Sequence, residues 1–314
     1  MIDATLSRAA DGERITPDEA VALYREAPLE DLGAAADAVV RRRYGDQITY
    51  NVNAHLNPTN ICVVGCGFCA FAVWTEKDER AYAYSVDQLV DRAVELSDLG
   101  ITELHIVGGM TKEYDLPYYE ELFRELKATL PHVSLTALTA VEVDFIARVS
   151  KVSHAEALRR LRAAGHDTMP GGGAEVFSAR VRKIIADRKV PAEVWLAVHR
   201  EAHAQGLRTN ATLLFGHFET PEEQVDHMSR LRDLQDDTPY NSYTRAGLPP
   251  TPIAMVGRAA LEAAVRPAKT DVLYFVATGK GDGRHYFSTS LVAHNANVAR
   301  HLANLRGGSP LQVR

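Results

Sequence analysis

The stretch TYNVNAHLNPTNICVVGCGFCA, residues 49–70, decides how the fold of this chain is to be interpreted. Its first part, Thr49–Leu56, alternates in the way that is typical of a β-strand. Its second part holds the three cysteines of the chain, Cys62, Cys66 and Cys69, in a CxxxCxxC spacing. Thiolates are soft ligands that suit a metal or an iron–sulfur cluster. We therefore expect a strand that leads directly into a metal-binding loop.

Three cysteines have a particular consequence for an iron–sulfur cube. The cube needs one ligand for each of its four irons, so three thiolates leave one iron open to bind another molecule. A disulfide would pair two of the cysteines and leave the third unpaired. The few residues between the cysteines would also strain the disulfide bond. A zinc site would need a fourth protein ligand, for which His55 is the nearest candidate. Both alternatives stay open, but the restrictive spacing favours the cluster.

The cysteine spacing, with Phe68 directly before the third cysteine, resembles the signature of the radical S-adenosylmethionine (SAM) enzymes. The resemblance implies a [4Fe–4S] cluster on Cys62, Cys66 and Cys69, with the open iron chelated by SAM. It also implies that an electron, delivered by a donor such as flavodoxin or ferredoxin, cleaves SAM to a 5′-deoxyadenosyl radical. In such enzymes the cofactor carries out the chemically difficult step, while the protein positions the cofactor and excludes water from the site.

Composition fits an enzyme of this kind. The chain has 314 residues, 46% of them hydrophobic and 24% charged, enough to bury one large core or two smaller ones. No run of about eighteen apolar residues occurs, so we expect no membrane span. The N-terminus lacks a basic region followed by an apolar core, so we expect no export signal. Reduced cysteines belong in a reducing compartment, and we expect a cytoplasmic protein.

The net charge of −6 is unevenly divided along the chain. Residues 1–238 carry 26 basic and 38 acidic side chains, whereas residues 239–314 carry 9 and 3. We attribute the positive charge of residues 239–314 to a basic surface exposed to solvent. This segment lacks the interleaved aromatic and arginine residues of a nucleic-acid binder. We predict no nucleic-acid partner, and a domain boundary between residues 238 and 239.

Strands and helices alternate through the acidic portion. Short apolar stretches predict further strands at Glu103–Val107, Val133–Thr139, around His166–Met169 and at Arg208–Leu214. Capping residues and helical spacing predict helices at residues 16–24, Leu29–Tyr44, Ser85–Leu99, Pro117–Leu130, Ser153–Ala164, Pro191–Gln205 and Pro221–Leu234. This order implies parallel strands with helical crossovers. We expect an α/β fold, a partial TIM-like (β/α) barrel over residues 46–238, preceded by a helical extension over residues 1–45.

Glycine-rich segments follow two of the predicted strands. Gly108 and Gly109 would let a ligand approach the backbone closely, or form a plain tight turn. The segment Pro170–Glu175 holds three consecutive glycines, which make sense where a ligand or another backbone comes close. Glu142 and Glu175 are suited to bind ribose hydroxyls or an ammonium group, and equally to cap helices. By the resemblance to radical SAM enzymes, the glycine pair contacts the methionyl amino group.

Five short sequence segments together resemble those of the aminofutalosine synthases, and the resemblance extends over about residues 14–237. They are HLNPTNIC (55–62), HIVGG (105–109), LTAVE (138–142), PGGGAE (170–175) and NATLLFGH (210–217). The resemblance implies addition of the 5′-deoxyadenosyl radical to 3-[(1-carboxyvinyl)oxy]benzoate with loss of CO2, which gives 6-amino-6-deoxyfutalosine in menaquinone biosynthesis. SAM is then consumed as a co-substrate. The nearest alternative is the related cyclase of the same pathway, which abstracts hydrogen and closes a ring.

The implied substrate is a dicarboxylate, which requires cationic or amide donors in a dry cavity. Four side chains near predicted strand ends could supply them: Asn57, Asn60, Arg208 and His217. Of these, Asn60 and His217 are our candidates for catalytic residues. His199 and His203 share a helix face that we expect to be solvated.

The tail over residues 239–314 has a different character. It predicts a helix at Arg258–Ala264, a β-hairpin that turns at Gly279–Gly283 and a helix at Ser290–Leu305, a small α+β segment. Residues 239–303 resemble the C-terminal end of the endolytic murein transglycosylases. Their catalytic glutamate lies upstream of this segment and has no match here, so glycan cleavage is a distant alternative. Because the synthase resemblance stops inside the barrel, a cluster-binding but inactive hybrid is a further one.

Overall fold

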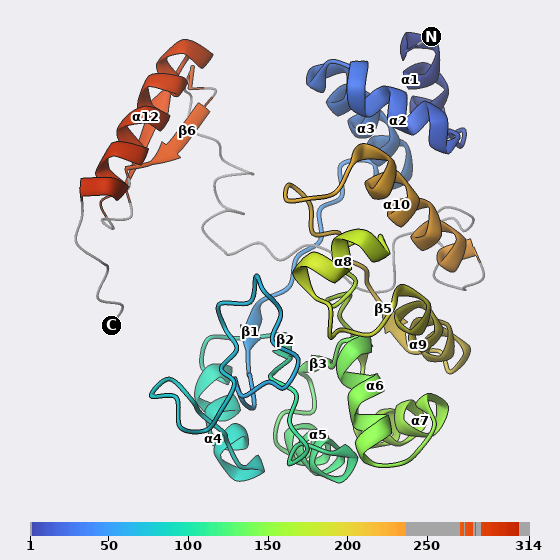
Figure 1. The fold of residues 1–314 in the computed structure, drawn as a ribbon, viewed down its shortest axis with the longest axis vertical. Coiled ribbons are helices and arrows are strands. Elements are labelled where there is room, and N and C mark those ends of the chain that lie inside the picture. The colour runs from blue at the N-terminus through green and yellow to red at the C-terminus, as the bar shows by residue number, and fades with distance from the viewer. Residues whose placement is uncertain (1, 237–270, 273, 279, 281–283, 308–314) are drawn as a thin grey trace. The chain divides into compact units, whose positions relative to one another are not determined.

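The computed structural model describes residues 2–236, 271–272, 274–278, 280 and 284–307 (Figure 1). The chain divides into two compact units, Met1–Val256 and Gly257–Arg314. The predicted helix at residues 258–264 lies outside the described residues. No described helix has the length and apolar character needed to cross a membrane.

Five parallel strands form the sheet of the first unit, in the order β1-β2-β3-β4-β5. Their bounds are Asn53–His55 (β1), Glu103–Ile106 (β2), Ser134–Ala137 (β3), Thr168–Met169 (β4) and Arg208–Thr209 (β5). At least one helix lies between consecutive strands, as parallel neighbours require. The predicted partial barrel is confirmed: among the described residues the sheet is open, because β1 and β5 do not pair with each other.

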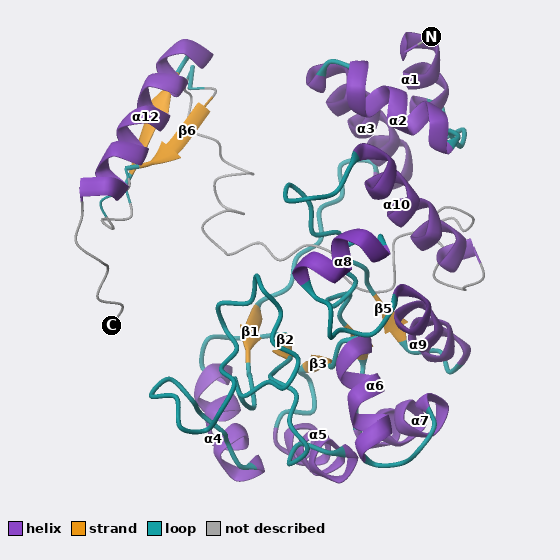
Figure 2. Cartoon of the chain, viewed as in Figure 1, coloured by secondary structure: helices purple, strands orange, loops and turns teal. Residues whose placement is uncertain are grey.

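Ten helices are described in this unit (Figure 2). Their bounds are Ile2–Ala10 (α1), Pro17–Glu26 (α2), Leu29–Tyr44 (α3), Val86–Ser97 (α4), Leu116–Thr129 (α5), Ala140–Val149 (α6), His154–Ala164 (α7), Ala179–Ile185 (α8), Ala192–Ala204 (α9) and Pro221–Asp236 (α10). Capping boxes at Thr16, Ser85 and Thr139 begin α2, α4 and α6. Helices α1, α6 and α8 are not among the predicted helices, and the strand predicted at Val133–Thr139 ends on the residue that caps α6.

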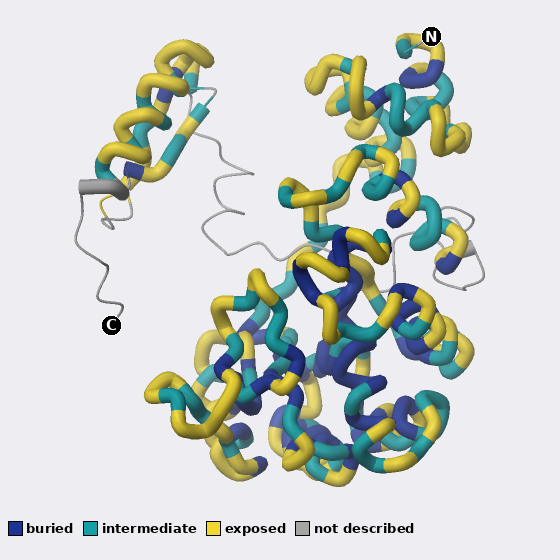
Figure 3. The backbone as a smooth tube through the Cα atoms, in the orientation of Figure 1, coloured by how far each residue is buried: buried dark blue, intermediate teal, exposed yellow. Residues whose placement is uncertain are grey.

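Alternation along the strands separates an apolar face from a polar one. Leu104, Ile106 and Leu135 are fully buried in the core that the strands form with the helices (Figure 3). The intervening residues are polar, and Glu103 and Thr136 line a cavity on the other face. This period of two is the one that a strand imposes on its side chains. The sheet therefore presents one packed face and one lined by polar groups.

The N-terminal helices pack against α10. Arg25 of α2 forms an ion pair with Glu222, at the start of α10. Farther along α10, Nη1 of Arg232 donates to the carbonyl of Ile15, 3.3 Å away. The extension that the sequence predicts is thus attached to the last described helix of the same unit.

The described part of the second unit is a hairpin covered by one helix. Strands β6 (Tyr274–Ala277) and β7 (His285–Ser288) pair antiparallel, and helix α12 covers Leu291–Gly307. Tyr274 stacks on His294 of the helix, with ring centroids 5.3 Å apart. The side-chain amide of Asn304 donates to the carbonyl of Thr278, 2.6 Å away. The predicted α+β segment is confirmed for these residues.

The prediction that His199 and His203 lie on a solvated face is wrong. His199 is fully buried and stacks on Trp195, one helical turn earlier, with ring centroids 3.6 Å apart. One ring nitrogen of each histidine hydrogen-bonds Oγ1 of Thr209 in β5, at 2.9 and 2.8 Å. The shared helix face packs on the sheet because Trp195 extends its apolar surface.

Two further buried histidines predict how stability depends on pH. Burial lowers the pKa of His166 to about 4, and burial likewise lowers that of His227 to about 4. The unfolded chain takes up these protons near pH 6.5, so it binds more protons than the folded chain between these values. We expect the free energy of unfolding of the apo protein to fall as the pH decreases from 6.5 to 4, by up to ~2 kcal/mol per histidine at pH 5. Urea denaturation at pH 7 and pH 5 measures this loss.

A variant identifies the source of that loss. Nε2 of His166 donates to the carbonyl of Ala137, 2.7 Å away, and glutamine can replace this donor. His166→Gln should therefore reduce the pH dependence, whereas His132→Gln, at an exposed position, should leave it unchanged. Equal unfolding free energies at pH 7 and pH 5 would contradict the prediction.

Candidate functional site

The three cysteines lie together after β1. Cys62 is buried, and Cys66 and Cys69 are half-buried and free of disulfides. Burial raises the pKa of the Cys66 thiol; Lys189 opposes this rise, while Cys62 and Cys69 add to it. Cys66 is thus within electrostatic reach of the two other thiols.

Three free thiols in one loop are a donor set that a four-iron cube can use. Among the described residues, no group of three or more His, Cys, Asp or Glu side chains converges on one metal ion. The ring of His55, the candidate fourth zinc ligand, lies 5.0 Å from the ring of His105. A four-iron cube distributes its thiolates over separate irons, so they need not converge on one point.

Backbone hydrogen bonds hold the cysteine loop from two sides. The amide of Val63 donates to the carbonyl of Met110, 3.0 Å away, in the segment that follows β2. The amide of Gly67 donates to the carbonyl of Ile185, 2.9 Å away, at the end of α8. The loop is therefore positioned by residues that lie far from it in the sequence.

Asn60 links the start of the loop to a neighbouring segment. Its side chain is buried, donates to the carbonyl of Arg80 and accepts from the amide of Tyr82, both at 2.9 Å. Asn57 is half-buried, and its Oδ1 has no hydrogen-bond partner among the described residues. The contacts of Asn60 are those of a positioning residue, and its catalytic role stays a prediction.

The pair Gly108 and Gly109 lies directly against the cysteine loop. The amide of Gly109 donates to the carbonyl of Thr59, 2.7 Å away. A Cβ atom on Gly109 would lie 2.1 Å from the carbonyl oxygen of Ile61, and one on Gly108 would lie 3.1 Å from that of Thr59. Gly109 has to be glycine because another backbone occupies the space of a side chain.

Glu142 connects the ends of two strands. Its carboxylate caps α6 through Thr139 and accepts a hydrogen bond from the amide of Gly108, 2.8 Å away. Burial raises the pKa of this carboxyl, and the hydrogen bonds from Thr139 and Gly108 oppose the rise. The helix-capping alternative is thus confirmed for Glu142, and its contact with a ligand stays a prediction.

Gly171, the first of the three consecutive glycines, packs against the segment that follows β5. A Cβ atom on Gly171 would lie 2.3 Å from Cα of Ala211. The amide of Gly171 donates to the side chain of Asn210, and Oγ1 of Thr212 donates to the carbonyl of Gly171, 2.8 Å away. Here too the close approach that the sequence predicts is that of another backbone.

Glu175 is bound to a cation that is not among the predicted site residues. Its backbone is left-handed, with φ of 50°, and its buried carboxylate forms an ion pair with Lys189. The ammonium of Lys189 also lies 5.3 Å from the ring centroid of Phe68, between two of the cysteines. The basic stretch that includes α8, residues 180–189, is the signal that could have indicated this cation.

Buried Arg182 is a second cation that is not among the predicted site residues. Its guanidinium donates to the carbonyl of Ala174, 2.5 Å away, and to that of Val190. It therefore joins the segment before α8 to the segment after it.

His217 is held within its own loop. Its Nε2 hydrogen-bonds the carbonyl of Leu214, 3.0 Å away, and its Nδ1 lies 3.0 Å from a carboxylate oxygen of Glu219. The amide of Phe218 donates to Nδ1, at 2.8 Å. Both ring nitrogens are thus engaged locally, and a catalytic role for His217 stays a prediction.

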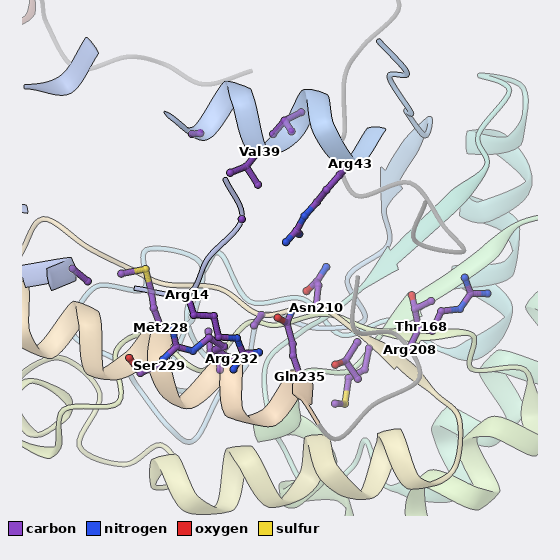
Figure 4. Close-up of a pocket in the computed structure, with 18 of the residues that line it drawn as sticks. Arg14, Val39, Arg43, Thr168, Arg208, Asn210, Met228, Ser229, Arg232 and Gln235 are labelled. Carbon is purple, nitrogen blue, oxygen red and sulfur yellow. The ribbon is translucent and has the colours of Figure 1, made fainter. Parts of the chain in front are cut away.

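A cavity of about 1230 Å³ lies on the polar face of the sheet (Figure 4). The cysteines and Gly108–Gly109 do not line it, although Asn210 lines it and binds Gly171. Among the described residues, the cavity is therefore distinct from the surface that carries the three thiols. Arg208, a predicted substrate contact, lines this cavity.

Two protein families match the chain. The radical SAM superfamily matches residues 56–231, and the YceG-like family matches residues 186–300. The second match begins upstream of the predicted junction near residue 239, and the two overlap at residues 186–231.

Curated relatives agree with the first match. The chain is 44% identical to cyclic dehypoxanthine futalosine synthase of Streptomyces coelicolor, over 74% of this chain and 59% of the relative. It is 42% identical to aminodeoxyfutalosine synthase of the same organism, over 76% and 62%. Against aminodeoxyfutalosine synthase of Thermus thermophilus the identity is 41%, over 74% and 62%. The aligned region spans about three fifths of each relative's length.

Solved structures share the fold. The FeFe-hydrogenase maturase HydG from Carboxydothermus hydrogenoformans superimposes with a TM-score of 0.59 and 20% identity, over 75% of this chain and 53% of that chain. Methylornithine synthase (PylB) superimposes with a TM-score of 0.59 and 15% identity, over 74% and 65%.

The backbone contact at Gly109 generates a prediction. Gly109→Ala should destabilise the protein by about 1–3 kcal/mol, because its Cβ would overlap the carbonyl of Ile61. It should also loosen the cysteine loop and make the thiols react faster with an alkylating reagent. Thermal unfolding and the rate of alkylation measure the two effects.

A matched glycine provides the control. A Cβ atom on Gly33, inside α3, would meet nothing within 4 Å. Gly33→Ala should stabilise the helix by roughly 0.5–1 kcal/mol and leave alkylation unchanged. If the two variants behaved alike, the contact with Ile61 would not hold the loop.

Proposed function

The chain belongs to the radical SAM superfamily, and we propose that it is an aminodeoxyfutalosine synthase of menaquinone biosynthesis. In this reaction the 5′-deoxyadenosyl radical adds to 3-[(1-carboxyvinyl)oxy]benzoate, CO2 is lost and 6-amino-6-deoxyfutalosine forms. The observation that carries the proposal is the braced loop with three thiols, in a chain 41–42% identical to two such synthases. A cytoplasmic location and an electron donor such as flavodoxin or ferredoxin are parts of the same proposal.

Cys62, Cys66 and Cys69 are the residues that would hold the cluster. Enzymes of this superfamily use a [4Fe–4S] cluster and SAM, and the bound cluster supplies the electron that cleaves SAM. The thiols must be deprotonated to bind iron. Lys189 favours this, because it lowers the pKa of the Cys66 thiol against the effect of burial.

The glycine pair offers carbonyls rather than amides to a ligand. The amides of Gly108 and Gly109 already donate to Glu142 and Thr59. An ammonium group is a donor and needs acceptors, which the carbonyl oxygens of both glycines are. We therefore assign recognition of the methionyl amino group to these carbonyls. Ribose recognition by Glu175 would require its carboxylate to be shared with Lys189.

The second candidate function is the cyclase of the same pathway. The chain is 44% identical to a cyclic dehypoxanthine futalosine synthase, slightly above its identity to the synthases. The two reactions differ in the fate of the adenosyl group, which enters the product in the synthase and leaves as 5′-deoxyadenosine in the cyclase.

Product analysis tests the proposal. The chain is reconstituted anaerobically with iron and sulfide, reduced, and supplied with SAM and 3-[(1-carboxyvinyl)oxy]benzoate or dehypoxanthine futalosine. Mass spectrometry should find 6-amino-6-deoxyfutalosine with the first substrate. A cyclised product from the second would favour the cyclase. Release of 5′-deoxyadenosine with neither product would indicate a cluster-binding hybrid that has lost substrate capture, and no cleavage of SAM would reject both activities.

Variants of the cysteines test the cluster assignment. Cys62→Ala, Cys66→Ala and Cys69→Ala should each bind little iron and release no 5′-deoxyadenosine, because each removes one of three ligands. Val63→Ala is the control, since Val63 is an exposed residue of the same loop. The iron content and the release of 5′-deoxyadenosine are measured for the cysteine variants and for the control. Normal cleavage by any cysteine variant would show that the cluster is held differently.

A further inference from the structure

We propose that the ion pair of Lys189 and Glu175 sets how easily the cluster on the cysteine loop is reduced. In this role Lys189 raises the reduction potential through its positive charge, and Glu175 holds the cation in place and limits its effect. Lys189 is thus a positioning residue for charge and not a ligand of the iron. The role rests on the proposed cluster at Cys62, Cys66 and Cys69, and it is independent of the identity of the substrate.

Lys189 is held between a carboxylate and the cysteine loop. Its ammonium forms an ion pair with the carboxylate of Glu175 and lies 5.3 Å from the ring centroid of Phe68. At this distance a cation is attracted to the face of an aromatic ring. Both charged side chains are largely buried, with 14% and 9% of their surface exposed. Buried charges are screened less than exposed ones, so this cation acts more strongly on its surroundings than a surface lysine does.

Backbone contacts fix the position of this cation relative to the loop. The amide of Gly67 donates to the carbonyl of Ile185, the last residue of α8, 2.9 Å away. The amide of Lys189 donates to the carbonyl of Ala186, 3.0 Å away, and closes a turn directly after that helix. The cation thus lies in a closed turn that begins at a backbone anchor of the cysteine loop.

The ion pair acts on the thiols as a dipole. Burial raises the pKa of the Cys66 thiol; Lys189 opposes this rise, and its effect exceeds that of Glu175, which adds to the rise. The positive end of the pair is therefore the one that dominates at the cysteine loop. Negative charge on the sulfur side is stabilised by this arrangement.

This cation offsets an acidic surrounding. Thiols bind iron as thiolates, and the buried carboxylates of Glu142 and Glu175 add further negative charge. Burial raises the pKa of the Glu142 carboxyl, and Lys189 is among the groups that oppose the rise. Arg182, also buried, is within electrostatic reach of Cys66. Helix α8 and the turn after it therefore place positive charge beside a site that gathers negative charge.

The sign of the effect on reduction follows from these charges. Reduction of an iron–sulfur cluster adds one electron and so one negative charge, and its potential depends on the charges around it. A nearby cation stabilises the reduced form more than the oxidised form, and a nearby carboxylate does the opposite. Lys189 therefore favours uptake of the electron, whereas Glu175 disfavours it.

The reduction potential of the reconstituted chain, measured without SAM or substrate, tests this role. Electron paramagnetic resonance follows the reduced cluster in samples poised at known potentials with dithionite and redox mediators. We expect Lys189→Gln to lower the ratio of reduced to oxidised cluster at a fixed potential about tenfold, a shift of about 59 mV for one electron. Glu175→Gln should shift the potential in the opposite direction, because it leaves the cation without its counter-charge.

Lys189→Arg and Lys183→Gln are the matched controls. Arginine keeps the charge at residue 189, so the potential should stay close to that of the wild type. Lys183 is an exposed residue of α8, and solvent screens its charge, so its loss should leave the potential unchanged. The iron content of each variant establishes that the cluster is present.

A double variant covers the case in which a single one does not fold. Lys189→Gln leaves the buried carboxylate of Glu175 unpaired, which is itself destabilising. Lys189→Gln combined with Glu175→Gln removes both charges and leaves none unpaired. Because the effect of Lys189 dominates at the loop, the double variant should still have a lower potential than the wild type.

The outcomes separate this role from the proposed function. Shifts of opposite sign for Lys189→Gln and Glu175→Gln, in a chain that forms no product, would support the role and reject the synthase. Unchanged potentials in Lys189→Gln and the double variant, with full iron content, would overturn the role and leave the synthase standing. Shifts of the same sign would indicate a loosened loop and would also overturn it. A wild-type chain that binds no cluster would overturn both.

Discussion

The close contact between the backbone of Gly109 and that of residues 59–61 is the constraint on which the candidate site depends. It joins the end of β2 to the start of the cysteine loop, at a distance that no side chain could share. The hydrogen bonds of Asn60 and the amide of Val63 extend the same attachment on both sides. The position of the thiols is therefore determined by backbone packing as much as by the cysteine spacing.

Much of the fold could be predicted from the sequence, because its strands alternate and most of its helices begin at clear capping residues. Helix α6 is the instructive exception. Most of its residues are buried, so its sequence AVEVDFIARV shows little of the polar face that marks a surface helix. The capping box at Thr139 was the available signal. Strand β5 is also shorter than predicted, since two of its residues pair with β4.

The residues of the candidate site also differ in how far the sequence predicts them. The cysteines are recognisable because their spacing is local, and the glycine segments because close backbone approach requires glycine. Lys189 and Arg182 could not be assigned, because their positions depend on how residues 174–190 fold back toward the cysteine loop. The cavity on the polar face of the sheet was missed for the same reason, because it forms only when α10 packs against the N-terminal helices.

Glu142 has a consequence for the thermodynamics of cofactor binding. One buried carboxylate caps α6 and accepts a hydrogen bond from the amide of Gly108, so it joins the loops after β2 and β3. The entropy lost in ordering these loops is lost during folding, before any ligand arrives. A cofactor that binds this surface meets a preorganised partner, and more of its interaction energy remains available as affinity.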